Sequence, residues 1–196
     1  LQSYDQPESS IILPDDGALY EQIVRLAKKT RSARLKTVVV IGIGGSNLGT
    51  KALYDAQWGY RDAFDAGRYP KLFFAETVDK EYLTALKKFI AGQSADEVQY
   101  VLISKSGTTT ETIAIADYLH IPAAHTTVIS DEGSALWNLA GQKGIARLPI
   151  PKTVGGRYSV FSPVGMFPLA LAGYDIAKLL KGASKMRDAC ISGDGL

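Results

Sequence analysis

The chain has 196 residues, and the 46% that are hydrophobic are enough to bury one sizeable core. Its 22 lysines and arginines nearly balance its 20 aspartates and glutamates, so the net charge of +2 gives no reason to expect a nucleic acid or a membrane as a partner. The single cysteine, Cys190, excludes an internal disulfide and favours a cytoplasmic location. No apolar run approaches the ~20 residues that a membrane-spanning helix needs.

Strands and helices are predicted to alternate along most of the chain. The first 14 residues are polar, include two prolines and are expected to form an extended arm. Asp15 or Asp16 can cap a helix that runs to about Thr30. The β-branched run 37–41 is typical of a central parallel strand. Further strands are predicted at 71–75, 98–103, 126–130 and 146–150, and further helices from 50 to about 56, at 79–89, at 113–119 and at 134–141.

This alternation predicts a doubly wound α/β fold, a three-layer α/β/α sandwich with a five-stranded, mainly parallel sheet of the flavodoxin-like kind. The strand at 146–150 contains Pro149 and is expected at an edge of the sheet. Ligands of such folds bind outside the carboxyl ends of the strands. The loops 42–49, 104–112 and 155–159 follow predicted strands and are therefore expected to lie at that edge.

The loop 104–112 is the most informative segment. It reads Ser-Lys-Ser-Gly-Thr-Thr-Thr-Glu-Thr and leads from a strand into a helix. Hydroxyl groups, the Lys105 ammonium and the free N–H groups of a helix start suit a small, multiply charged anion such as a phosphate. An alternative needs no ligand, because Thr108 and Glu111 fit a capping box at the helix start.

The loop 42–49 is rich in glycine and lets the backbone approach a ligand closely, although a tight turn without a ligand also fits. A dinucleotide-binding loop is a second alternative, with Glu76 on the ribose of NAD. It is disfavoured because Asn47 stands where that motif has its third glycine. The segment 155–159 presents Arg157 after two glycines, either towards an anion or simply on a surface loop.

Taken together, three motifs resemble the glucose-6-phosphate isomerase (phosphoglucose isomerase) family in its bacterial form. They are, in order, Ile-Gly-Ile-Gly-Gly-Ser-Asn-Leu-Gly at 41–49, the serine- and threonine-rich run at 104–112, and Gly-Gly-Arg-Tyr-Ser-Val-Phe-Ser-Pro-Val-Gly at 155–165. The resemblance extends from about Val38 to Gly173. The second motif is shared more loosely by sugar-isomerase (SIS) domains, which bind phosphosugars.

The resemblance implies a reversible aldose–ketose isomerisation of glucose 6-phosphate and fructose 6-phosphate, without a metal or an organic cofactor. Arg157 would stabilise the developing enediolate and is the one catalytic residue implied here. Gly156 would lie beside the reacting carbons. The implied phosphate and sugar contacts are Ser104, Lys105, Ser106 and Thr109 for the phosphate, and Gly45 and Ser46 for the sugar.

The resemblance also places three groups of the family's mechanism after the glycine-glycine-arginine motif, in a second SIS domain. These are a base glutamate, a ring-opening histidine and a lysine, and Glu76, Glu111 and Glu132 do not occupy the motif of the base. The chain, which starts without Met, is expected to be an N-terminal fragment with negligible turnover of its own. A non-catalytic, phosphosugar-sensing SIS domain remains an alternative.

The expected organisation has an arm and helix at 1–36, the phosphosugar-binding SIS domain at 37–173, and a helix or linker at 174–196 towards the second domain. The full-length enzyme would be a homodimer. A chain without its second domain should expose apolar surface, and we expect this surface at 160–171.

Overall fold

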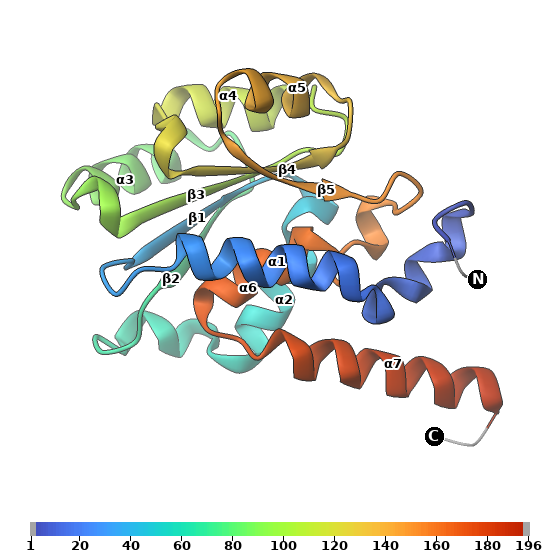
Figure 1. The fold of residues 1–196 in the computed structure, drawn as a ribbon. Coiled ribbons are helices and arrows are strands. Elements are labelled where there is room, and N and C mark those ends of the chain that lie inside the picture. Colours follow the sequence, from blue (N-terminus) through green and yellow to red (C-terminus); the bar gives the residue numbers. More distant parts are fainter. Residues whose placement is uncertain (1–2, 194–196) are drawn as a thin grey trace.

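The computed structural model describes residues 3–193 and contains a five-stranded sheet whose strands all run parallel (Figure 1). The strand order β2-β1-β3-β4-β5 is that of the flavodoxin-like doubly wound fold, and it confirms the predicted fold class. In register, Val39 of the interior strand β1 lies between Phe73 of β2 and Tyr100 of β3. The strands are β1 (Thr37–Ile41), β2 (Lys71–Ala75), β3 (Val98–Ile103), β4 (Thr126–Asp131) and β5 (Ala146–Ile150).

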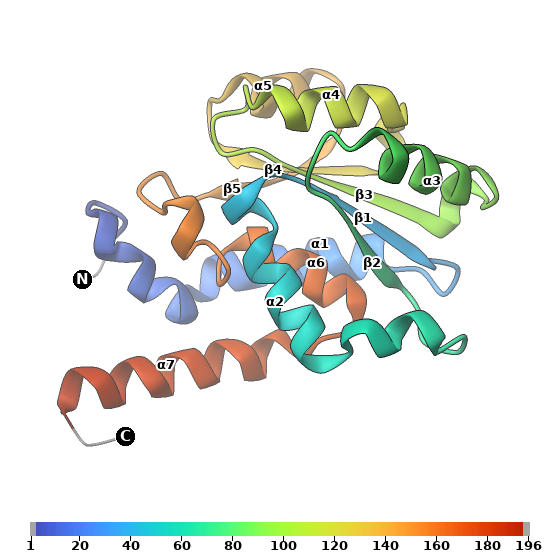
Figure 2. The same cartoon turned by 180° about the vertical axis from the view of Figure 1, so that it is seen from behind.

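Helices cover both faces of the sheet, as the two opposite views show (Figures 1 and 2). One face carries α3 (Lys80–Ala91), α4 (Thr110–Leu119) and α5 (Ala135–Gln142). The other face carries α1 (Gly17–Thr30), α2 (Leu48–Gln57) and α6 (Pro163–Ala172), with α7 (Ile176–Ser192) lying outside them. Each face of the sheet therefore has its own apolar core. Ligands of such folds bind at the loops that follow the carboxyl ends of the strands.

The predicted elements form for local reasons. All five residues of β1 are buried, as expected for a β-branched strand in the interior of a parallel sheet. The side chain of Asp16 accepts a hydrogen bond from the Leu19 N–H and caps α1, as predicted. Asp79 caps α3 and Ser134 caps α5 in the same way, so that these helix starts are encoded in the sequence.

The prediction of an extended N-terminal arm is wrong. Residues Pro7–Asp15 form a 3-10 helix, while residues 1–2 of the predicted arm lie outside the described residues. Leu13 is buried in the core next to α1, and Asp15 pairs with Arg187 of α7. Burial of apolar side chains such as Leu13 in the core stabilises this otherwise polar stretch against the rest of the structure.

The prediction of an exposed apolar surface at 160–171 is also wrong. Helix α6 is buried almost throughout, and Phe167 and Leu169 are fully inaccessible to solvent. The helix lies on the sheet between α1 and α2 and also contacts α7, which lies outside it (Figure 1). A helix that is apolar on all sides is typical of such a buried position, and the sequence pattern alone does not say what covers it. No helix within residues 3–193 is long and apolar enough to cross a membrane.

Candidate functional site

The loop between β3 and α4 folds tightly onto itself and groups its hydroxyls. Ser104 is buried, and its Oγ lies 2.9 Å from Oγ1 of Thr109 and accepts a hydrogen bond from the Gly107 N–H. Ser106 is exposed, and its Oγ accepts hydrogen bonds from the N–H and the hydroxyl of Thr108. Gly107 has a positive φ of 72°, which a residue with a Cβ would adopt only with strain.

The start of α4 is not capped in the way that its sequence suggests. Thr109, not Thr108, occupies the N-cap, so the alternative of a capping box formed by Thr108 and Glu111 does not hold. Among the described residues, the Thr109 side chain makes no capping hydrogen bond, because its hydroxyl is turned to Ser104. The first N–H groups of a helix have no partner inside the helix. Together with the helix dipole, they leave a favourable position for an anion at this loop.

Residues at the carboxyl end of β4 hydrogen-bond to the main chain of this loop. The Ser130 hydroxyl, fully buried at the end of β4, donates to the carbonyl oxygen of Ser104 at 2.6 Å and also lies 2.6 Å from the Ser134 Oγ. The Asp131 N–H donates to the Lys105 carbonyl oxygen. Burial raises the pKa of the Asp131 carboxyl, and two nearby lysines oppose this rise. The sequence reasoning missed Ser130, although a hydroxyl at the carboxyl end of a strand was the available signal.

The first and third motifs are in direct backbone contact. A Cβ placed on Gly45 would lie 2.3 Å from the carbonyl carbon of Gly156, so this approach requires a glycine. The Ser159 Oγ lies 2.8 Å from the Gly156 carbonyl oxygen in its own turn and 3.1 Å from the Gly45 carbonyl oxygen, so that one hydroxyl is shared between the two loops. Figure 2 shows the orange turn that follows β5 beside the start of α2. Gly45 and Ser46 are both partly exposed at this contact.

The second motif is joined to the segment that leads to the third. The Lys105 ammonium donates to the carbonyl oxygens of Lys152 and Val154, at 2.6 and 2.8 Å. Arg157 follows on the 3-10 helix Gly156–Tyr158 and is exposed, with its guanidinium 5.7 Å from the ring centroid of Tyr158. The three loops that the sequence predicted at one edge of the sheet thus meet there.

The acidic residues weighed in the sequence analysis lie around these loops in different settings. Glu76 forms an ion pair of 2.6 Å with Lys51 of α2. Glu111 in the first turn of α4 and Glu132 after β4 are both exposed. Within residues 3–193, no three histidine, cysteine, aspartate or glutamate side chains are grouped so that they could hold a metal ion.

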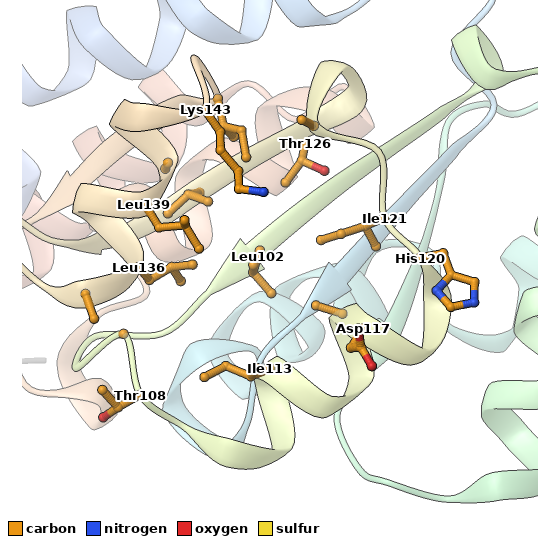
Figure 3. Close-up of a pocket in the computed structure, with 17 residues that line it drawn as sticks. Leu102, Thr108, Ile113, Asp117, His120, Ile121, Thr126, Leu136, Leu139 and Lys143 are labelled. Carbon is orange, nitrogen blue, oxygen red and sulfur yellow. The ribbon is translucent and has the colours of Figure 1, made fainter.

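A separate groove lies between α4 and α5 and has a volume of about 700 Å³ (Figure 3). Leu102 forms part of its floor, and Ile113, Leu136 and Leu139 line its sides. Gly107 and Thr108 of the loop 104–112 also line this groove. Most of its lining is apolar, however, and provides few polar groups to bind a charged sugar phosphate. The groove is therefore distinct from the candidate site at the strand ends.

The strand order and the position of these loops define the class of the molecule, an SIS-like α/β domain. Comparison with known families narrows this class. The chain belongs to the phosphoglucose isomerase family, whose family model matches residues 20–193.

Individual relatives agree with this membership. The chain is 35% identical over 183 residues to a glucose-6-phosphate isomerase of Mycoplasmopsis pulmonis, a match that covers 84% of this chain and 40% of the relative. It is 38% identical over 173 residues to the enzyme of Parabacteroides distasonis, covering 80% and 37%. The chain thus spans about 40% of the length of the curated relatives that it matches.

Solved structures show the same relationship. A hypothetical protein of Thermus thermophilus has a TM-score of 0.76 and 32% identity, with 92% of this chain and 43% of that chain covered. A glucose-6-phosphate isomerase of Chlamydia trachomatis has a TM-score of 0.70 and 28% identity, with 86% and 33% covered.

Proposed function

We propose that this chain is the N-terminal phosphosugar-binding part of a glucose-6-phosphate isomerase, which interconverts glucose 6-phosphate and fructose 6-phosphate through an enediolate. The observation that carries the proposal is the meeting of three loops at the carboxyl edge of the sheet, through the Gly45–Gly156 contact and the Lys105 hydrogen bonds. Residues 37–173 would be the binding domain, preceded by an arm and helix at 1–36 and followed by a connection to a second SIS domain at 174–196.

The phosphate group would bind at the 104–112 loop. The hydroxyls of Ser104, Ser106 and Thr109 and the uncapped N–H groups of α4 supply donors, and Lys105 adds a positive charge. Binding energy from this remote phosphate would help to hold the reacting carbons in place.

The sugar would extend from the phosphate towards the other two loops. Gly45 and Ser46 would contact its hydroxyls, and Gly156 would lie beside C1 and C2. An aldose–ketose interconversion moves a proton between C2 and C1, and negative charge develops on the enediolate oxygens in between. Arg157, exposed after two glycines, is suited to stabilise that charge.

The proton itself needs a base, and none of the groups above is suited to that role. Glu76 is paired with Lys51, and the resemblance places the family's base in sequence beyond the 196 residues of this chain. We therefore propose that this chain binds the sugar phosphate and that the whole enzyme, a cytoplasmic homodimer, completes the chemistry. The exposed thiol of Cys190 suits a reducing compartment.

Calorimetric titration of the chain with fructose 6-phosphate tests the proposal. Saturable binding is expected, and the matched control is fructose, which has the same sugar without the phosphate and should not bind at the same concentration. A Ser106→Ala variant should bind more weakly, because one phosphate donor is lost. Equal binding of fructose and fructose 6-phosphate, or no binding of either, would contradict a preformed phosphosugar site.

A further inference from the structure

We infer that the side chain of Lys105 positions the loop that carries Arg157, and thereby couples the phosphate loop to the part of the site where the sugar reacts. The inference rests on the proposed phosphosugar site and deepens it. The Lys105 ammonium donates hydrogen bonds to carbonyl oxygens of the protein. Lys105 is therefore assigned a positioning role in addition to the attraction of its charge for a phosphate.

The geometry of the ammonium carries the inference. A lysine ammonium has three N–H donors, and two of those of Lys105 are directed to main-chain oxygens of one short segment, those of Lys152 and Val154. The distances of 2.6 and 2.8 Å are typical of strong, charge-assisted hydrogen bonds. The contact with Val154 is partly buried, whereas the contact with Lys152 is exposed, so water competes less for the hydrogen bond to Val154.

Apart from the Lys105 contacts, the segment that receives these hydrogen bonds is held by a turn and by the Thr153 hydroxyl, which donates to the Tyr4 carbonyl oxygen at 3.1 Å. It leaves β5 and forms a turn in which the Val154 N–H donates to the Pro151 carbonyl oxygen. Val154 is fully buried in the core, and the 3-10 helix that carries Arg157 begins two residues later. At the far end of this helix, the Ser159 hydroxyl lies within hydrogen-bond distance of the carbonyl oxygens of both Gly156 and Gly45, at 2.8 and 3.1 Å. Lys105 and Ser159 thus fasten the Arg157 loop on either side, each to a different motif of the site.

The arrangement has a consequence for binding that can be measured. Inorganic phosphate would touch only the phosphate loop, whereas fructose 6-phosphate would also touch the Arg157 loop. If Lys105 acts through that loop, its loss weakens sugar-phosphate binding more than phosphate binding. A lysine that served only as a direct phosphate ligand would affect both by the same factor.

Hydrogen exchange of the ligand-free chain provides the first test. In a Lys105→Met variant, the amides of Val154, Tyr158 and Ser159 should exchange about tenfold faster or more, because the hydrogen bonds that hold the loop are lost. Lys105→Arg, which retains charged donors, should restore much of the protection. Lys152→Met is the matched control, since this exposed lysine lies in the same loop and near Asp131, as Lys105 does, but takes part in the Lys105 contact only through its carbonyl oxygen.

Each outcome of this test decides the inference. Unchanged exchange at these three amides, or the same change in Lys152→Met, would overturn it. The amides of β3 serve as an internal reference for the intact fold, and Lys105→Gln replaces Lys105→Met if those amides also lose protection.

Titration of the same variants with inorganic phosphate and with fructose 6-phosphate provides the second test. Lys105→Met should lose about tenfold more affinity for fructose 6-phosphate than for phosphate, and Lys105→Arg should recover most of the difference. Equal losses for the two ligands would overturn the positioning role. If the unmodified chain bound neither ligand, the proposed function would fail, while the exchange measurement would still decide whether Lys105 holds the loop.

Discussion

Arg157 is the residue on which the proposed chemistry depends most. It lies exposed on a single turn of 3-10 helix, and none of the ion pairs formed among residues 3–193 involves its guanidinium. Its nearest described interaction is with the ring of its neighbour Tyr158, at 5.7 Å. A charged group presented in this way is available to a ligand, and the proposed isomerase site needs it whereas a domain that only senses sugar phosphates does not.

Substitution Arg157→Ala distinguishes the two views. The variant should lose about 10- to 100-fold in affinity for a sugar-acid phosphate whose carboxylate occupies the position of the enediolate, because a charge-assisted contact is removed. Its affinity for inorganic phosphate should stay within about twofold of the original. Calorimetry measures both, with Arg25→Ala on the exposed side of α1 as the control. Unchanged affinity for the sugar acid would favour the sensing domain.

Gly45 permits the closest approach between two of the loops. In a Gly45→Ala variant, the added methyl would meet the backbone of Gly156, so we expect a loss of about 1–3 kcal/mol in the free energy of unfolding. Urea unfolding measures it. The control is Gly182→Ala in α7, where a Cβ meets nothing within 4 Å and where a slight gain of about 0.5–1 kcal/mol is expected. Equal effects in the two variants would speak against a tight contact between the loops.

At the scale of elements, α6 shows how strongly packing decides the role of a segment. Its sequence is apolar on every side, which suits either an interface with another domain or a central helix of the core. The structure places it on the sheet between α1 and α2, with α7 outside it. The loop that carries Arg157 leads directly into α6, so the buried helix anchors the C-terminal end of that loop.

Truncation of Phe167 measures this role directly. The side chain is fully buried, so Phe167→Ala should lower the free energy of unfolding by about 3–5 kcal/mol. Ile191→Ala in α7 is the control, because that side chain is 69% exposed and its loss should cost less than about 0.5 kcal/mol. Thermal or urea unfolding of the isolated chain gives both values. A loss of less than about 1 kcal/mol in the free energy of unfolding of Phe167→Ala would contradict a buried α6 and favour an exposed one.

The sequence predicted the strands and most helices because their signals are local. Buried parallel strands read as apolar runs, and Asp16, Asp79 and Ser134 mark helix starts that the structure confirms. The errors arose where a distant partner decides the outcome. The 3-10 helix at Pro7–Asp15 forms against the core, and the hydroxyl of Thr109 pairs with Ser104 instead of capping α4.

The position of the candidate site was predictable from the sequence, but the contacts that join its loops were not. Its three loops could be placed at one edge because parallel strands end together, and this needed only the order of the motifs. The contacts that join the loops were not predictable, since Gly45 meets Gly156, and Lys105 meets Val154, only after the chain has folded. The binding roles of the individual residues stay predictions until a ligand is tested.

At the scale of the whole molecule, the chain spans about 40% of the length of its curated relatives. The proposed function assigns the phosphosugar site to these residues and the base to other sequence, so we expect binding without proton transfer at an appreciable rate. General acid–base groups typically contribute ~10²–10⁴-fold each, so turnover of glucose 6-phosphate should be lower than that of a full-length relative by at least such a factor.

A coupled assay of the purified chain measures this turnover. Arg157→Ala is the control, because residual activity that persists unchanged in this variant belongs to a contaminant. Turnover close to that of a full-length relative, and abolished by the substitution, would mean that this chain contains its own base.

The most direct test of the account is to map where fructose 6-phosphate binds, by recording amide chemical shifts of the ¹⁵N-labelled chain during a titration. The account predicts saturable shifts that appear together in the three loops, at 44–46, 104–112 and 155–159, while amides of the α4–α5 groove such as that of Leu139 stay unchanged. Shifts in only one loop, shifts centred on the groove, or no saturable shift would contradict the claim that the three loops form one phosphosugar site.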